Sequence, residues 1–185
     1  FENNDIFFSD YDYTLISLAT LHPIVFLDIF LGNKEILDYR VAHIFSDNSD
    51  IPRNPISVID DELILKWCDF NAMLRYPLVA SVIIPFKNMG NELQWTTLAM
   101  ALIINSPDPM IVLNQLKTSF RPTSWSDSLS EIMHSRLTLL IALMENEDPI
   151  VSEWAIKEER VFINEIRSVR EWELRDEEKN NERFE

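Results

Sequence analysis

Glycine is scarce in this 185-residue chain, which contains only Gly32 and Gly90. A loop that wraps backbone amides around a phosphate needs several closely spaced glycines, because a residue without a Cβ lets the backbone approach the ligand. The sequence therefore argues against P-loop and dinucleotide-binding sites, and no cofactor is expected. The same scarcity is typical of helices that pack directly on one another.

Cysteine is almost absent too, since Cys68 is the only thiol and an internal disulfide is excluded. This use of cysteine fits a reducing compartment, so we expect a cytoplasmic location. Together with three scattered histidines, His22, His43 and His134, one cysteine does not readily supply the ligands of a zinc site. No metal is expected, although a site of converging carboxylates is an alternative that sequence does not exclude. Cys68 follows Trp67 on an apolar helical face, which is typical of a buried, inert thiol.

Long hydrophobic runs are missing as well. The longest, 78–84 and 137–144, fall well short of the roughly 20 residues that a membrane-spanning helix needs. We therefore expect no membrane partner. The chain begins Phe-Glu-Asn-Asn, without an initiator Met or a cationic leader, so we expect a piece of a longer polypeptide or a trimmed one.

Acidic residues are abundant by contrast. The chain has 31 Asp and Glu against 16 Lys and Arg, a net charge of −15. Such a surface repels nucleic acids and anionic membranes and attracts basic proteins. Residues 1–70 carry 13 acids and 4 bases, and residues 151–185 carry 11 and 7. The charge is therefore concentrated toward both ends.

Apolar residues recur with helical spacing along most of the chain, and we expect an all-α protein without strands. With 46% hydrophobic residues, one domain spanning 1–185 is the simplest organisation. The loop at 46–55, rich in Asp, Asn and Pro, suggests a subdivision into 1–50 and 56–185. The predicted helices are 14–22, 23–31, 34–45, one starting after 60–62, 71–84, 91–105, 109–120, one capped by Ser126 or Asp127 and running to 143, and one from 149 onward.

Proline recurs four times in a similar context, each time followed by two aliphatic residues and a helical stripe, at Pro23, Pro77, Pro109 and Pro149. Proline fixes φ and lacks an amide hydrogen that the first helical turn does not use, so Pro23 and the Asp-Pro pairs at 109 and 149 are predicted to open helices. The intervals of 54, 32 and 40 residues bracket the roughly 40 to 47 residues of helix-pair repeats. Pairs of this kind bury their apolar faces only by stacking on neighbours.

The segment 139–155 resembles the turn of a HEAT repeat. It has an apolar helix, a short acidic turn containing Asp148-Pro149, and a second helix with an early aliphatic residue and an alanine. The junction at 105–113 is a shorter echo. The stretch from Tyr76, especially 121–128 and the charged end 170–185, also resembles the carboxy-terminal part of large bacterial helical-repeat proteins.

The resemblance to HEAT and armadillo arrays implies irregular antiparallel helix pairs, stacked as an α-solenoid or a compact helical bundle. It also implies a non-catalytic scaffold that binds other proteins.

The candidate partner-binding residues include an acidic cluster, Asp47, Asp50, Asp60, Asp61 and Glu62. Carboxylates at the rim of an interface steer a basic partner toward it. The alternative is that Asp60 and Asp61 cap a helix and the others keep the protein soluble.

Trp125 is the other candidate. Its position in a loop between two predicted helices suits an anchor for a partner, because Trp is over-represented at binding hot spots. A wedge between helices is the alternative. The neighbouring serines, Ser124, Ser126 and Ser128, lack the Gly-x-Ser-x-Gly pattern of a nucleophile elbow, and no catalytic residue is assigned.

These observations predict a non-catalytic protein–protein interaction or scaffold module that is part of a larger bacterial protein. The alternative is a small acidic immunity-type inhibitor that neutralises a basic toxin or nuclease. Sequence leaves the oligomeric state open.

Overall fold

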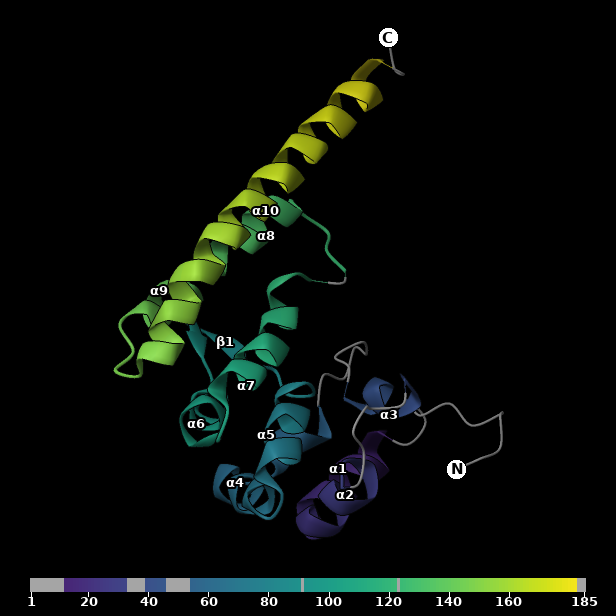
Figure 1. Cartoon of the computed structure of the whole chain (residues 1–185). Coiled ribbons are helices and arrows are strands. Elements are labelled where there is room, and N and C mark those ends of the chain that lie inside the picture. The colour runs from purple at the N-terminus through teal and green to yellow at the C-terminus, as the bar shows by residue number, and fades with distance from the viewer. Residues whose placement is uncertain (1–11, 33–38, 46–53, 91, 123, 183–185) are drawn as a thin grey trace. The chain divides into compact units, whose positions relative to one another are not determined.

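The computed structural model describes residues 12–32, 39–45, 54–90, 92–122 and 124–182 (Figure 1). These residues are mostly helical, which confirms the all-α prediction in its coarse form. They belong to two compact units. One combines the chain up to Pro85 with Thr96–Leu116, and the other combines Phe86–Trp95 with Lys117–Glu185. The boundaries between the units therefore lie at 85, 95 and 116, and residues 46–53 of the predicted loop lie outside the described residues.

The first unit is a set of short helices around an apolar core. Several of its described helices start at residues that favour a first helical turn. Pro23 occupies the first turn of α2 (Pro23–Phe30), and the side chain of Asp60 caps α4 (Asp61–Asp69). The helices are α1 (Asp12–Leu21), α2 (Pro23–Phe30), α3 (Tyr39–Ile44), the 3₁₀ helix η2 (Pro55–Val58), α4 (Asp61–Asp69), α5 (Ala72–Ala80), α6 (Thr97–Asn105) and α7 (Pro109–Leu116).

Two polar anchors hold this unit together across long stretches of sequence. Asn54 is buried, donates to the carbonyl oxygens of Phe45 and Val82, and accepts from the amide of Ile56. The indole nitrogen of Trp67 donates to Asp28, 2.8 Å away, and so links α4 to α2. Buried polar groups are tolerated only when they are paired, and both anchors meet that condition.

The second unit consists of a hairpin and a long helix with shorter helices against it. Helix α10 (Pro149–Glu182) packs against α8 (Leu129–Ser135) and α9 (Leu137–Met144), and strand β2 (Glu92–Trp95) contacts α9. Phe120 lies at the centre of an aromatic cluster, with its ring 5.6 Å from that of Phe162, 5.8 Å from Trp95 and 6.2 Å from Phe86. The elements are β1 (Phe86–Met89), β2 (Glu92–Trp95), the 3₁₀ helix η3 (Lys117–Phe120), α8 (Leu129–Ser135), α9 (Leu137–Met144) and α10 (Pro149–Glu182).

The hairpin corrects the expectation of helices alone, and in particular the predicted helix at 91–105. Strands β1 and β2 pair antiparallel with Met89 opposite Glu92, and Gly90 lies in the turn that follows β1. Gly90 has a φ of +67°, a conformation that glycine adopts without strain. A Gly-Asn pair between two strand-like segments is a known hairpin signal. The prediction of a helix at 91–105 gave more weight to the helical spacing of Leu93 and Trp95 than to this signal. The helix itself, α6, begins at Thr97 with Thr96 as its cap.

Two other boundaries differ from the predictions. The helix predicted at 71–84 ends at Ala80, with Pro77 inside it, whereas Pro23, Pro109 and Pro149 open helices. The helix predicted to run from 126 or 127 to 143 is broken at Arg136 into α8 and α9, and its cap is Ser128, whose hydroxyl accepts from the amide of Glu131. Three serines in this loop can cap a helix, and tertiary contacts select one.

Within the described residues no single helix is long and apolar enough to cross a membrane. One pair, Tyr13–Leu21 with Pro23–Phe30, meets the criteria of length and composition together, but it is bent by 120°.

Candidate functional site

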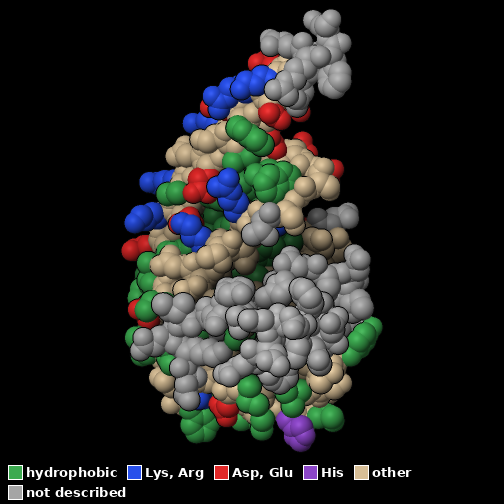
Figure 2. Space-filling view, turned by 90° about the vertical axis from the view of Figure 1, so that its right-hand side faces the viewer, with side chains coloured by type: hydrophobic (Ala, Val, Ile, Leu, Met, Phe, Trp, Pro, Cys, Tyr) green, Lys and Arg blue, Asp and Glu red, His purple; other side chains and the backbone are tan. Residues whose placement is uncertain are grey.

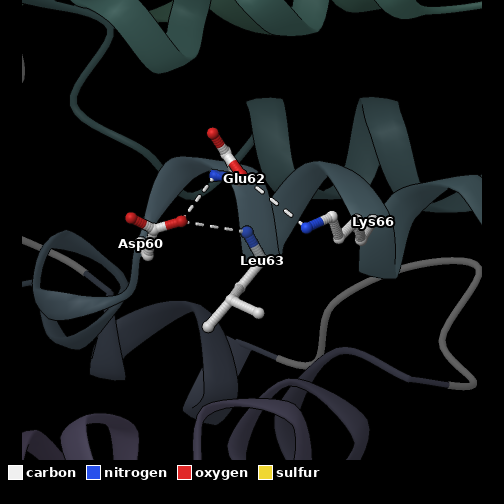
Figure 3. A network of polar contacts seen from close by, with 4 residues as sticks. All are labelled: Asp60, Glu62, Leu63 and Lys66. Carbon is white, nitrogen blue, oxygen red and sulfur yellow. Dashed lines mark hydrogen bonds and ion pairs between the residues drawn. The ribbon is translucent and has the colours of Figure 1, made fainter.

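The acidic cluster is the first predicted site, and the structure describes only part of it. Asp47 and Asp50 lie outside the described residues. Asp60 uses one carboxylate oxygen to accept hydrogen bonds from the amides of Glu62 and Leu63, at 2.9 and 3.3 Å (Figure 3). Amides at the start of a helix have no partner within it, so this carboxylate stabilises the first turn of α4.

The other two acids of the cluster also have partners. Asp61 accepts a hydrogen bond of 2.7 Å from the hydroxyl of Thr97, which links α4 to α6. Glu62 forms an exposed ion pair with Lys66, one turn along the same helix, at 3.6 Å (Figure 3). Each described acid of this cluster is therefore engaged within the chain, which weakens the case for a docking surface here.

Trp125, the second predicted site, lines a groove of about 730 Å³ in the second unit. One wall is the segment that leads into α8, and the floor is one face of α10. The α10 residues lie three and four positions apart, which places them on one side of the helix. The groove is lined by Arg121, Trp125, Leu129, Val161, Asn164, Glu165, Ser168, Val169 and Trp172.

Trp125 and Trp172 differ from Trp67 and Trp95, and also from Trp154, which is buried. Trp67 and Trp95 are at most partly exposed, and their indole nitrogens donate to Asp28 and to the carbonyl oxygen of Leu139. Trp125 and Trp172 are 45% and 51% exposed. Within the part of the chain that the structure describes, neither indole has a hydrogen-bond partner. Two large amphipathic rings therefore face one hollow with unused donors.

The groove also contains two unpaired charges. Glu165 lies on its floor and Arg121 on its wall, and among the described residues neither takes part in an ion pair. In Figure 2 hydrophobic side chains are exposed among acidic and basic ones along α10, in the upper part of the view. Among the described residues, the groove thus combines aromatic faces with a carboxylate and a guanidinium that form no ion pair.

Glu173, on α10, fixes the segment that forms the groove wall. Its carboxylate accepts hydrogen bonds from the amides of Leu129 and Ser130, at 2.6 and 3.3 Å, and from the hydroxyl of Ser128 at 3.1 Å. Partial desolvation favours the neutral acid, but the hydrogen bonds from Ser130, Ser128 and Leu129 outweigh it and lower the pKa of Glu173. The start of α8 is thereby attached to α10.

The remaining reactive side chains do not form a site. Cys68 is buried, and desolvation, followed by the nearby Asp69 carboxylate, raises the pKa of its thiol to about 12, so it is inert at neutral pH. His22 and His134 are exposed, and the side chain of His43 lies outside the described residues. No group of three His, Cys, Asp or Glu side chains within the described ranges could hold a metal ion.

Sequence reasoning missed Trp172 and Glu165 as members of the groove. The signal was present, since positions 161, 165, 169 and 172 form a second helical stripe beside the buried one at 155, 162 and 166. Spacing alone does not distinguish a face that neighbours cover from one that stays open, because both have the same period.

Comparison of the chain with protein-family models, with curated proteins and with solved structures found no match.

Proposed function

We propose that this chain is a non-catalytic protein-binding module that acts through the groove between α10 and the segment leading into α8. The observation that carries the proposal is the pair of half-exposed tryptophans, Trp125 and Trp172, at one hollow. Tryptophan is enriched at binding hot spots because its large apolar ring gains much from desolvation while its N–H supplies a directed contact.

The groove has the dimensions and support of a recognition site. Its volume of about 730 Å³ lies in the range of about 300 to 1,000 Å³ that pockets for compact ligands occupy. Its floor is a continuous helix, and Glu173 holds its wall in place through the start of α8. A preformed site loses little conformational entropy on binding.

The acidic cluster supports a docking surface less well, since Asp60 and Asp61 already accept hydrogen bonds within the chain. HEAT-like stacking of helix pairs and a relationship to bacterial helical-repeat proteins stay predictions. The proline-led starts of α2, α7 and α10 support them.

Selection of peptides from a random display library against the full chain tests the proposal. We expect enriched peptides to bind the wild-type chain and to lose about tenfold or more in affinity to Trp125→Ala and Trp172→Ala, as is typical of hot-spot truncations. Binding is measured by titration of synthetic copies of the enriched peptides.

Phe70→Ala is the matched control. Phe70 is 85% exposed, so it is an accessible aromatic side chain outside the groove, and its removal is expected to leave peptide affinity unchanged. Failure to enrich any peptide would overturn the proposed function, as would peptides whose affinity depends on Phe70 and not on the two tryptophans.

A further inference from the structure

We propose that the groove takes a cationic segment of a partner protein, with an arginine or lysine side chain lying against the indoles of Trp125 and Trp172 and its charge against Glu165. This inference rests on the proposed function and specifies the partner's chemistry. It follows from three observations, namely the unpaired carboxylate on the groove floor, an internal example of the same contact, and the charge surrounding the groove.

Glu165 occupies the middle of the groove floor. It lies one turn after Val161 and one turn before Val169, and Trp172 follows one turn further on. Its carboxylate has no ion-pair or hydrogen-bond partner among the described residues. A carboxylate beside aromatic faces favours a cation, because the negative face of each ring and the carboxylate attract the same charge.

The first unit contains the arrangement that we propose, formed within the chain. The guanidinium of Arg75 lies 4.0 Å from the centre of the Trp67 ring, and its Nη2 is 3.6 Å from the Asp28 carboxylate. An indole, a carboxylate and a guanidinium therefore combine there in one cluster. The groove presents two indoles and a carboxylate, and among the described residues no guanidinium lies over these rings or pairs with Glu165. A guanidinium is therefore the part of the cluster that a partner would supply.

The surrounding charge selects a cationic partner over a second copy of the chain. Along the groove the charges on α10 balance, since residues 161–172 carry two acids and two bases, whereas residues 173–182, which follow the groove, carry five acids and two bases. The whole chain carries a net charge of −15, so two copies repel one another while a basic segment is attracted and steered to this end of α10. Arg121 is the cation among the lining residues, and its charge opposes a basic ligand.

The opposite charges of Glu165 and Arg121 make a paired test possible. Three fluorescein-labelled synthetic peptides share the same apolar residues and differ only in carrying Arg, Gln or Glu at the remaining positions. Their affinities for the full chain, for Glu165→Gln and for Arg121→Gln are measured by fluorescence anisotropy at about 50 and about 300 mM NaCl, which changes electrostatic screening. Circular dichroism of each variant checks that it is folded.

We expect the Arg peptide to bind the wild-type chain most tightly and to weaken at the higher salt concentration. Glu165→Gln is expected to weaken it about threefold to fivefold, the range of an exposed ion pair, and to abolish most of its preference over the Gln peptide. Arg121→Gln is expected to leave the affinity equal or higher.

The inference is overturned if the Gln or Glu peptide binds as tightly as the Arg peptide, or if Arg121→Gln weakens the Arg peptide more than Glu165→Gln does. It is also overturned if none of the three peptides binds while library-selected peptides still require Trp125. In all of these cases the proposed function survives, whereas a library that yields no peptide removes both.

Discussion

Replacing Asp28 with alanine tests how strongly α2 is attached to α4 and α5. The carboxylate accepts a hydrogen bond of 2.8 Å from the indole nitrogen of Trp67 and lies 3.6 Å from the guanidinium of Arg75. Trp67 is only 2% exposed. Asp28→Ala therefore leaves a donor on a buried ring without the acceptor that it has in the native protein.

The magnitude follows from three contributions. An unsatisfied buried donor destabilises the folded state by about 1 to 3 kcal/mol. The ion pair with Arg75 adds at most about 1 kcal/mol, because the Asp28 side chain is 54% exposed and water screens it. Alanine offsets part of the loss, by about 0.5 to 1 kcal/mol, since it favours helix more than Asp and removes a negative charge from the last turn of α2. The midpoints of these three ranges give an expected net loss in the free energy of unfolding of about 1 to 2 kcal/mol.

Asp28→Asn separates these contributions, because the amide oxygen still accepts from Trp67 while the charge is lost. We expect a loss below about 0.5 kcal/mol for this variant. Both variants are compared with wild type by urea unfolding, followed by circular dichroism and tryptophan fluorescence. Glu153→Ala, at an exposed helical carboxylate with no partner among the described residues, is the control. An equal loss for Asp28→Ala and Asp28→Asn, or no loss for either, would refute the assignment of the hydrogen bond as the main contribution.

Three further predictions concern other buried or paired groups. Asn54→Leu is expected to lower the free energy of unfolding by about 2 to 4 kcal/mol, because two buried carbonyl oxygens and one amide lose their partner. A change under about 1 kcal/mol, measured by urea unfolding, would contradict this expectation. Cys68, with a pKa of about 12 and no exposure, is expected to react with Ellman's reagent at pH 8 only after unfolding, and rapid labelling of the native chain would count against burial. The pKa of Glu173 is lowered in the folded state, so its hydrogen bonds stabilise the protein fully above its ordinary pKa of 4.5, and that stabilisation is lost as the pH falls through the lower folded value. The stability difference between wild type and Glu173→Gln should accordingly shrink in acid, and a pH-independent difference in unfolding midpoint would argue against this role.

The sequence predicted the helices well where local signals agree. Asp60 before an apolar stripe specified the start of α4, and Pro109 and Pro149 specified the starts of α7 and α10. Capping and proline effects act within one helical turn, so they can be read without knowledge of neighbours. Pro77 shows the limit, because the same residue is tolerated inside α5 when packing outweighs the lost hydrogen bond.

The hairpin was missed because two local signals competed. Leu93 and Trp95 fit a helical stripe with the residues of α6, while Gly90-Asn91 fits a two-residue turn. Which signal prevails depends on contacts distant in sequence. The ring of Trp95 lies against Phe120, and its nitrogen donates to the carbonyl oxygen of Leu139, 44 residues away, and these contacts favour the strand.

The candidate site, like the fold, was predictable from local sequence only in part. Sequence by itself determined the helical content, most helix starts, the excess of acidic charge and Trp125 as a candidate anchor, because composition and spacing encode these directly. Only the tertiary structure decided that Asp60 and Asp61 are engaged within the chain, and that Trp125 shares a groove with Trp172 and Glu165. The physical reason is that periodicity specifies which residues share a helix face, whereas the packing of α8 and α9 on α10 determines which face is covered and which is left open to a partner.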